Sequence, residues 1–274
     1  GLYYPFGGGM ASIWSGQLPQ VNVKAEVTGG SVINVIQVAR GESDLGIAMA
    51  DVLSDAYLGQ GRFPEALPLR VLFSAYPNIV HLLALEDSKI GSVKDLRGKR
   101  VSIGAQGSGT AVAATNLLNG LGIGLEGLAV RYLSFGETSS ALKDGTIDAG
   151  FIVGGLGLAA ITELSVSRDM RLIPLTDSDI AALTEQFPSY SSYLIPGGTY
   201  SGVDKDVQAL GIWSAVVVHE AMSDDLAYQL ICSIYNHQSR LLKVSAVAKA
   251  VYPALDHFYD SVPFGWRRCA AATI

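Results

Sequence analysis

The sequence has 274 residues, of which 49% are apolar and 16% are charged, and its formal net charge is −6. This length suits one large domain or two lobes, and the apolar content is that of a chain with a real core rather than a disordered one. The mild acidity argues against a nucleic-acid partner, because binding phosphates requires a basic stripe. No apolar run reaches the ~18 residues that a membrane span needs.

The two cysteines, Cys232 and Cys269, could pair in an oxidising compartment. Cys232 lies in an apolar helical pattern, and this position favours two free thiols. The chain begins at Gly1, without Met and without the basic start and apolar middle of a signal peptide. We therefore expect a processed form with its signal peptide removed, so the missing signal does not indicate a cytoplasmic protein.

Apolar residues recur at helical spacing in some segments and alternate in others, and these patterns predict a succession of helices and strands that is typical of an α/β protein. In the first part of the chain we expect a loop and then a helix over 8–16, a strand over 21–28, a helix from Ser31 to Gly41, a strand over 45–50, a helix over 52–59, and a strand pair, 69–75 and 79–85, around Tyr76-Pro77-Asn78. In the second part we expect strands over 129–133, 147–153, 170–175 and 207–218, helices over 137–143, 156–164 and 224–242, and a connector over 193–200.

The central stretch, residues 99–122, reads as strand, glycine-rich turn and helix. Gly104, Gly107 and Gly109 break the strand, and Ser108 or Thr110 can cap the helix that follows. A helix start with unpaired N–H groups, small residues and hydroxyls is suited to binding a carboxylate or phosphate. The alternative is an ordinary tight turn between a strand and a helix.

Two segments of the chain resemble each other. Both contain a helix, then Gly-x-x-Asp, then a buried strand, and their glycines, Gly41 and Gly145, lie 104 positions apart. Each is preceded and followed by a turn of small residues. The repetition predicts two similar α/β lobes, with ligands bound at the carboxyl ends of their strands.

The sequence contains no Gly-x-Ser-x-Gly motif and no phosphate-binding Gly-x-x-x-x-Gly-Lys-Ser/Thr loop, and Gly104–Gly109 is not a Gly-x-Gly-x-x-Gly fingerprint. The four histidines show no metal-ligand spacing, so we expect neither a metal site nor a cofactor. His81 and His219 lie in or beside apolar strands and read as structural residues. Backbone donors and short hydroxyls bind a small anion without activating it, and this favours a carrier over an enzyme.

Several side chains at helix starts and strand ends are candidate ligand contacts, each with a structural alternative. Tyr3 and Tyr4 could stack on a ligand or pack in the core, and Thr28 and Ser31 could bind it or cap a helix. Asp51 could accept a hydrogen bond from a ligand amine or cap the next helix. The remaining candidates are Phe135 and Glu137 as one wall, Arg131 as a partner for a carboxylate, and Ser108, Gly109 and Thr110 as anion donors.

The motifs YYPFGG, TGGS, GESDLGIAMADV, DLRGKRVSIGAQGSGT and IPGGTY resemble those of the TAXI family, the extracytoplasmic solute-binding proteins of tripartite ATP-independent periplasmic (TRAP) transporters. The likeness covers roughly residues 3–263. It implies a type II periplasmic-binding-protein fold, in which two α/β lobes are joined by crossing strands and a ligand cleft lies between them. It also implies capture of a small carboxylate, such as a glutamate-like amino acid or another organic acid, and delivery to TRAP membrane permease subunits.

Carried over onto this chain, the resemblance and the reading of the residues together predict one set of ligand-binding residues. They are Tyr3, Tyr4, Thr28, Ser31, Met49, Ala50, Asp51, Gln106, Ser108, Gly109, Thr110, Phe135, Gly154 and Gly155. The expected lobes are residues 1–85 with 205–274, and residues 86–204. We expect a periplasmic or membrane-anchored extracytoplasmic monomer without enzymatic activity.

Three departures from the TAXI pattern stand out. The strand and loop that precede the Tyr-Tyr-Pro motif are absent from this sequence, and the turn at Gly154-Gly155 lacks the proline that usually follows it. The ending PFGWRRCAAATI differs from the family's His-Gly-Ala-x-x-Tyr-Tyr-like last helix. Two other function classes stay open from the sequence: an enzyme on the same fold, and a ligand-sensing domain.

Overall fold

The computed structural model describes residues 1–251, which divide into two compact units. Unit 1 consists of Gly1–Ala48, Asp55–Tyr76 and the described residues from Trp213 on, and unit 2 of Met49–Ser54 and Pro77–Ile212. Two long strands, β2 (Leu69–Leu85) and β8 (Val207–His219), each contribute residues to both units. The expected α/β class is confirmed, whereas the lobe boundaries expected from the sequence stay predictions.

The described strands form one mixed sheet in the order β1-β8-β2-β5-β3-β4, with β6 beside β2 and β7 beside β8. The shorter strands are β1 (Leu45–Met49), β3 (Arg100–Ser102), β4 (Ala129–Arg131), β5 (Ala149–Gly154), β6 (Met170–Leu172) and β7 (Tyr190–Ile195). β3 runs parallel to β4 and to β5, and β2 is antiparallel to β5, with Ile79 opposite Gly154. The carboxyl ends of β3 and β5 therefore meet at one edge of unit 2, where open α/β sheets bind their ligands.

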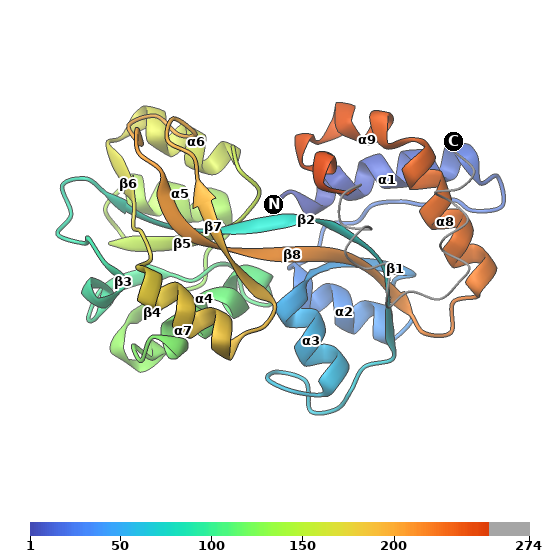
Figure 1. Ribbon diagram of the computed structural model, residues 1–274, viewed down its shortest axis with the longest axis horizontal. Coiled ribbons are helices and arrows are strands. Elements are labelled where there is room, and N and C mark those ends of the chain that lie inside the picture. The colour runs from blue at the N-terminus through green and yellow to red at the C-terminus, as the bar shows by residue number, and fades with distance from the viewer. Residues whose placement is uncertain (252–274) are drawn as a thin grey trace. The chain divides into compact units, whose positions relative to one another are not determined.

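In unit 1, α1 (Tyr3–Gln17) packs against α8 (Asp224–Asn236) and α9 (Gln238–Val244), as Figure 1 shows. Trp14, which is 2% exposed, donates from its indole N–H to the carbonyl of Leu230 at 2.8 Å. Its ring and Phe6 lie in one apolar cluster with Tyr76 of β2 and Val216 of β8. This core fixes the N-terminal helix to the strands. The unit also contains α2 (Ser31–Ala39) and the end of α3 (Ala50–Leu58).

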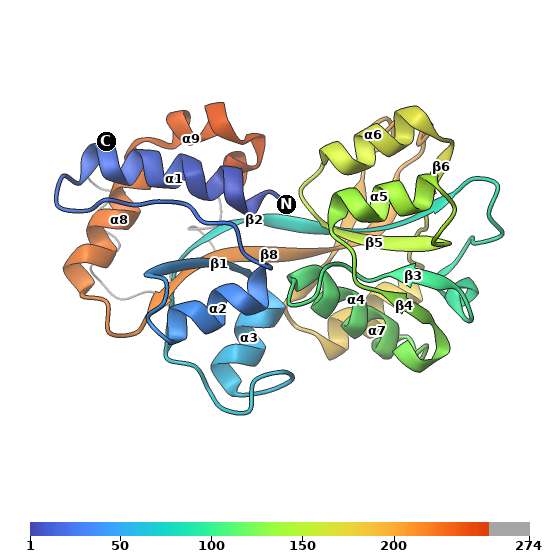
Figure 2. The same ribbon diagram turned by 180° about the vertical axis from the view of Figure 1, so that it is seen from behind.

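In unit 2, α4 (Gly109–Gly120) contacts β5 and α7 (Asp177–Gln186), and α5 (Phe135–Lys143) contacts β5 and α6 (Ala159–Ser167). Figure 2 shows α5 and α6 side by side near β5. Short 3-10 turns occur at Val93–Leu96, Leu125–Gly127 and, in unit 1, Ala246–Ala250. Each helix thus covers the sheet or a neighbouring helix.

The two Gly-x-x-Asp segments adopt the same turn at the ends of α2 and α5. Gly41 and Gly145 have φ of +69° and +67°, which is the left-handed conformation that ends a helix most easily at glycine. In α2 the N–H of Gly41 bonds to Val38 and that of Glu42 to Gln37, and in α5 the equivalent bonds run from Gly145 and Thr146 back to Leu142 and Ala141. The sequence likeness therefore reflects a repeated helix–turn–strand structure.

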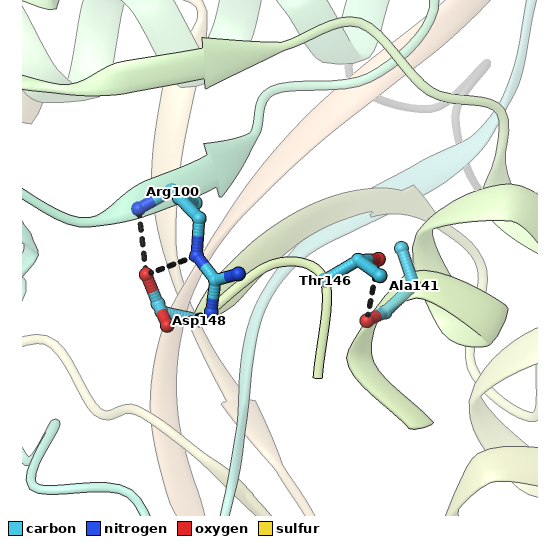
Figure 3. Close-up of polar contacts among 4 residues, drawn as sticks. All are labelled: Arg100, Ala141, Thr146 and Asp148. Carbon is cyan, nitrogen blue, oxygen red and sulfur yellow. Dashed lines mark hydrogen bonds and ion pairs between the residues drawn. The ribbon is translucent and has the colours of Figure 1, made fainter. Parts of the chain in front are cut away.

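The second of these turns is fixed to the neighbouring strand by an ion pair (Figure 3). Both carboxylate oxygens of Asp148 accept hydrogen bonds from Arg100, at 2.6–3.1 Å, and one of the three donors is the Arg100 backbone N–H. These bonds, led by those from the Arg100 side chain, lower the pKa of Asp148. On the other side of the turn, the Thr146 hydroxyl donates to Ala141 at 3.2 Å.

The sequence patterns predict the first two elements of the chain wrongly. The first helix begins at Tyr3 rather than near Gly8, since Pro5 falls in the first turn, where no helical hydrogen bond needs its N–H. Gly9 is tolerated inside α1 because a Cβ there would lie 2.7 Å from Leu241 Cδ1, so glycine lets α1 and α9 approach closely. The structure assigns no strand to residues 21–28; the Val23 backbone instead exchanges hydrogen bonds with the Ser15 hydroxyl of α1, at 3.0 and 3.3 Å.

The strand pair expected around Tyr76-Pro77-Asn78 is wrong, because Leu69–Leu85 forms one continuous strand. A residue that precedes proline prefers an extended conformation, which a strand supplies as well as a turn does. The Asn78 amide donates to the Ile212 carbonyl of β8 at 3.2 Å, so this polar side chain contacts the neighbouring strand.

Other boundaries differ as well. The helix expected over 156–164 begins at Ala159, since Gly157 has a φ of +71° before it. The connector expected over 193–200 includes the second half of β7. α7, whose start is a capping box between Thr176 and Asp179, had no expected counterpart. The helix expected over 224–242 is two helices, α8 and α9, that meet at His237. The tail after Pro263 lies outside the described residues.

The preference for free thiols is wrong for Cys232, which is disulfide-bonded. The apolar helical pattern around Cys232 reports burial and carries no information on oxidation state, which depends on the compartment. The other cysteine of the sequence, Cys269, lies outside the described residues.

Candidate functional site

The start of α4 in unit 2 is a helix N-terminus at which some backbone N–H groups form no hydrogen bond within the described residues. The hydroxyl of Ser108 caps the helix: it accepts from the Ala111 N–H at 3.1 Å and donates to the Ala105 carbonyl at 2.6 Å. The next two N–H groups, of Gly109 and Thr110, form no hydrogen bond within the described residues. The first turn contains no acidic side chain that would neutralise the positive end of the helix dipole.

Thr110 adds a third donor. Its side chain is only 3% exposed, yet its hydroxyl forms no hydrogen bond within residues 1–251. Its Cβ and methyl carbon face Gly104, so the hydroxyl branch is turned away from that glycine. Two backbone N–H groups and one hydroxyl therefore gather in the first turn of α4. Such a set binds an anionic oxygen through neutral hydrogen bonds.

Gly104 gives this turn its shape. Its φ is +94°, a conformation that other residues rarely adopt, and a Cβ at this position would lie 2.6 Å from Thr110 Cβ and 3.1 Å from Ser108 Oγ. The glycine thus allows the strand end to approach the helix start closely, and it holds the donor set in place.

A second turn of unit 2, between β5 and α6, contains Gly154 and Gly155, both of which are buried. It is linked to the core by a chain of hydrogen bonds. Nδ1 of His81 lies 3.2 Å from the Ile152 carbonyl, Nε2 lies 3.0 Å from the Tyr200 hydroxyl, and that hydroxyl accepts from the Gly157 N–H at 3.2 Å. Because Nδ1 faces a carbonyl oxygen it carries a proton, and in a neutral imidazole Nε2 then accepts from the Tyr200 hydroxyl.

The titration behaviour of this pair agrees with that arrangement. Complete burial lowers the pKa of His81 to about 4, and burial raises the pKa of Tyr200 to about 12, so both groups are neutral at pH 7. His81 is therefore the structural residue that the sequence predicts, and its partners were not predictable from it. His81 and Tyr200 together hold Gly157, which comes shortly after the Gly154-Gly155 turn.

Asp51 is a buried carboxylate of unit 2, 5% exposed, in the first turn of α3. One oxygen accepts from the Val52 N–H at 2.8 Å, and the other accepts from the Tyr190 hydroxyl at 2.9 Å. Tyr190 in turn accepts from the Asn116 amide of α4 at 3.0 Å. Asp51 therefore caps its helix and is tied to α4 through Tyr190.

In unit 1, hydroxyl groups meet where two helices begin. Tyr3 is the first residue of α1 and Ser31 the first of α2, and their hydroxyl oxygens lie 3.4 Å apart. The Tyr3 hydroxyl also lies 2.7 Å from that of Ser214, a fully buried residue of β8. Tyr4, the neighbour of Tyr3, is 53% exposed. These contacts join α1, α2 and β8 through uncharged groups.

The other expected residues have varied positions. The Thr28 hydroxyl donates to the Asn34 side chain and accepts from the Gly30 N–H at 3.2 Å, so it stabilises the turn before α2. Met49 is the buried end of β1, Ala50 begins α3, Gln106 is exposed, and Phe135 begins α5. Glu137 completes a capping box with Ser134, and the hydrogen bonds from Ser134 lower the pKa of the Glu137 carboxyl. Arg131 is exposed.

The structure thus brings Ser108, Gly109 and Thr110 together in unit 2, and Tyr3 with Ser31 in unit 1. Five polar residues at these places were not expected: Tyr76, Asn116, Tyr190, Tyr200 and Ser214. Tyr76 and Ser214 have apolar neighbours in their strands, whereas Tyr190 and Tyr200 stand beside serine and threonine residues, and the sequence patterns assigned a contact to none of them. Within the described residues there is no cluster of His, Cys, Asp and Glu that could hold a metal, and none of the helices is long and apolar enough to cross a membrane.

A model of the NMT1-like family matches residues 1–264 of the chain. Among solved structures, the chain is similar to the periplasmic aliphatic sulphonate binding protein SsuA from Escherichia coli, with 16% identity and a TM-score of 0.50. That match covers 92% of this chain and 80% of SsuA.

Two further structures are similar. The substrate binding protein of an amino acid ABC transporter has 15% identity and a TM-score of 0.52, with 93% of this chain and 88% of that one covered. A Xanthomonas citri protein bound to ATP has 11% identity and a TM-score of 0.57, with 100% and 96% covered. At these identities the likeness establishes the fold, which is that of the periplasmic solute-binding proteins, as the sequence predicts.

Proposed function

We propose that this chain, which belongs to the NMT1-like family, is a solute-binding protein that holds a small carboxylate and releases it unchanged. Its fold is that of proteins that bind sulphonates and serve an amino acid transporter. The proposal extends this general role to one ligand class.

One observation carries the proposal: the first turn of α4 presents the N–H groups of Gly109 and Thr110 and the Thr110 hydroxyl, without a hydrogen bond to any of them in the described part of the chain. Neutral donors at the positive end of a helix stabilise an anion, and they neither take up nor supply a proton. This chemistry suits binding rather than catalysis. The resemblance to the TAXI family supports a glutamate-like amino acid or another organic acid as the anion.

The same resemblance supports delivery of the acid to TRAP permease subunits. We propose an extracytoplasmic location for the protein, and two observations support it: SsuA is periplasmic, and the Cys232 disulfide is typical of an oxidising compartment. Pull-down with TRAP permease subunits tests the partner. Retention that depends on the bound acid supports this partner, and retention by permease-free membranes alone contradicts it.

Thermal unfolding with a panel of L-glutamate, L-glutamine, 2-oxoglutarate, succinate and ethanesulfonate tests the ligand class. A ligand that binds only the folded protein raises its stability by about 2.7 kcal/mol at one hundred times Kd, so at least one acid raises Tm by several degrees. The sulfonate, which resembles the cargo of SsuA, competes as the other anion class. A rise in Tm with ethanesulfonate alone contradicts a carboxylate ligand. If no compound raises Tm, the proposal that the protein binds a small carboxylate is contradicted.

The variant Thr110→Val then locates the site, because valine keeps the shape of threonine and lacks the hydroxyl. Losing one hydrogen bond to a charged group costs about 1.5–3 kcal/mol, which weakens Kd for the selected acid at least about tenfold. Thr115→Val in the same helix is the matched control, since the Thr115 hydroxyl donates to the Ala111 carbonyl and is expected to leave Kd unchanged. Equal affinities for the two variants would remove Thr110 from the site.

A further inference from the structure

The turn between β5 and α6, in unit 2, contains a backbone donor without a partner. Gly155 follows the last residue of β5 and is buried, yet its N–H forms no hydrogen bond within the described residues. Buried backbone N–H groups are nearly always paired, because a donor that is buried without a partner has lost its hydrogen bonds to water. The Gly155 N–H is therefore available to a bound molecule.

The pairing of β2 gives the direction of this N–H. β5 and β6 both pair with β2 at Leu83, so they lie on opposite sides of it. The Leu82 carbonyl accepts from the residue that follows β6 and thus faces β6. Because directions alternate along a strand, Ile79 faces β5, and the carbonyl of its partner Gly154 faces β2. The N–H and C=O of one trans peptide point in opposite directions, so the Gly155 N–H points away from β2, towards the side of β3.

The start of α4 lies on that same side of β5. β3 and β5 are parallel, with Ser102 beside Gly150. β5 continues to Gly154, whereas β3 ends at Ser102 and is followed by the turn that leads into α4, a helix that contacts β5. The Gly155 N–H therefore points to the side of β5 at which α4 begins. Its direction makes it a further neutral donor for an anion held by the donor set of α4.

Two buried side chains fix the turn on both of its sides. The Tyr200 hydroxyl accepts from the Gly157 N–H, just before α6, a helix that has no side-chain cap of its own. Tyr200 donates to His81, which in turn donates to the Ile152 carbonyl of β5. Ile152 precedes the turn and Gly157 follows it. One hydrogen-bonded pair thus sets the path of the backbone through Gly154-Gly155.

We propose that His81 and Tyr200 are positioning residues, which hold the Gly155 N–H where it donates to the anionic group of the bound acid. The two side chains act through the backbone of the turn and not by contact with the acid. This inference rests on the proposed function, since Gly155 serves the same carboxylate as the donors of α4. It adds a second wall to that site within unit 2 and assigns a role to a buried pair that the proposed function does not use.

An amide chemical-shift titration of the unaltered, isotope-labelled protein tests the contact. The ligand is the acid selected from the panel of L-glutamate, L-glutamine, 2-oxoglutarate and succinate. We expect the Gly155 resonance to move downfield and to saturate at the calorimetric Kd, whereas the Gly157 amide, which already donates to Tyr200, should move little. If Gly155 does not move while Thr110→Val still weakens Kd, the inference is overturned and the proposed function stands.

The variant Tyr200→Phe tests the positioning role, because phenylalanine keeps the ring and lacks the hydroxyl. We expect Kd to weaken about tenfold, since the Gly155 N–H is no longer held in place. Ser165→Ala is the matched control: Ser165 is a buried residue of α6 whose hydroxyl donates to the Thr162 carbonyl, so a hydrogen bond is lost from the same helix without a change in the turn. An unchanged Kd for Tyr200→Phe, or equal losses of affinity in both variants, overturns the inference.

Two substitutions of His81 separate positioning from packing, and they also decide the question if Tyr200→Phe does not fold. Glutamine supplies a carbonyl oxygen that accepts from the Tyr200 hydroxyl, whereas leucine supplies no acceptor. We expect His81→Gln to keep Kd within about twofold and His81→Leu to weaken it about tenfold. Equal affinities of these two variants overturn the inference. If no acid binds the unaltered protein, the proposed function fails and this inference fails with it.

Discussion

The substitution Gly104→Ala tests whether the turn between β3 and α4 is built as described. An L residue at a φ of +94° costs about 1–2 kcal/mol in backbone strain. The new Cβ would also lie 2.6 Å from Thr110 Cβ, and forcing an extra carbon into a packed site costs about 1–3 kcal/mol more. We therefore expect the free energy of unfolding to fall by about 2–5 kcal/mol, and Tm by at least about 4 °C.

Gly98→Ala separates the two contributions. Gly98 has a φ of +73°, but nothing lies within 4 Å of its Cβ position, so this variant carries the strain without the clash. Urea unfolding monitored by circular dichroism gives both free energies, and calorimetry gives the affinity for the selected acid. We expect Gly104→Ala to lose more stability than Gly98→Ala and to bind the acid more weakly, because Thr110 is displaced. Equal losses, or an unchanged affinity, would refute the description of this turn.

Two further predictions concern titration and charge. Burial lowers the pKa of His81 from 6.5 to about 4. As the pH falls, His81 therefore takes up a proton in the unfolded chain before it does so in the folded protein. The free energy of unfolding is highest above pH 6.5 and falls by up to about 3 kcal/mol as the pH drops towards 4. Urea unfolding at pH 7 and 4.5 should show a smaller loss for His81→Gln than for the unaltered protein, and equal losses would contradict the neutral imidazole. Asp148→Asn should lower the free energy of unfolding by about 1–2 kcal/mol, a modest value because the Arg100 side chain is 42% exposed. If removal of the Asp148 charge has no effect, the ion pair does not stabilise the second Gly-x-x-Asp turn.

Local patterns predicted much of the fold. The Gly-x-x-Asp repeat, the buried strand 45–49 and the capped start of α4 were all visible in the sequence, since each depends on glycine conformation, capping residues or periodicity within a few positions. The long strand β2 was not, because a Tyr-Pro-Asn sequence suits a turn as well as an extended strand, and the contact that decides, from Asn78 to Ile212, spans 134 positions.

The candidate site divides in the same way. Ser108, Gly109 and Thr110 were predictable as a helix start, whereas the roles of the individual donors were not, because only the structure shows that Ser108 is used as the cap. Tyr76 and Ser214 escaped prediction, since each lies in a largely apolar strand and its spatial neighbours come from distant parts of the chain. The identity of the acid is also poorly encoded, because main-chain donors carry no side-chain information.

The most direct test of the central claim is an amide chemical-shift titration of the isotope-labelled protein with the acid that raises Tm most. Because the bound carboxylate would accept hydrogen bonds from the N–H groups of Gly109 and Thr110, these two resonances should move downfield and saturate at the calorimetric Kd. The amide of Gly120, at the other end of α4, reports effects on the helix as a whole and should move little. Saturable shifts elsewhere, with Gly109 and Thr110 unmoved, would contradict an anion-binding role for this helix.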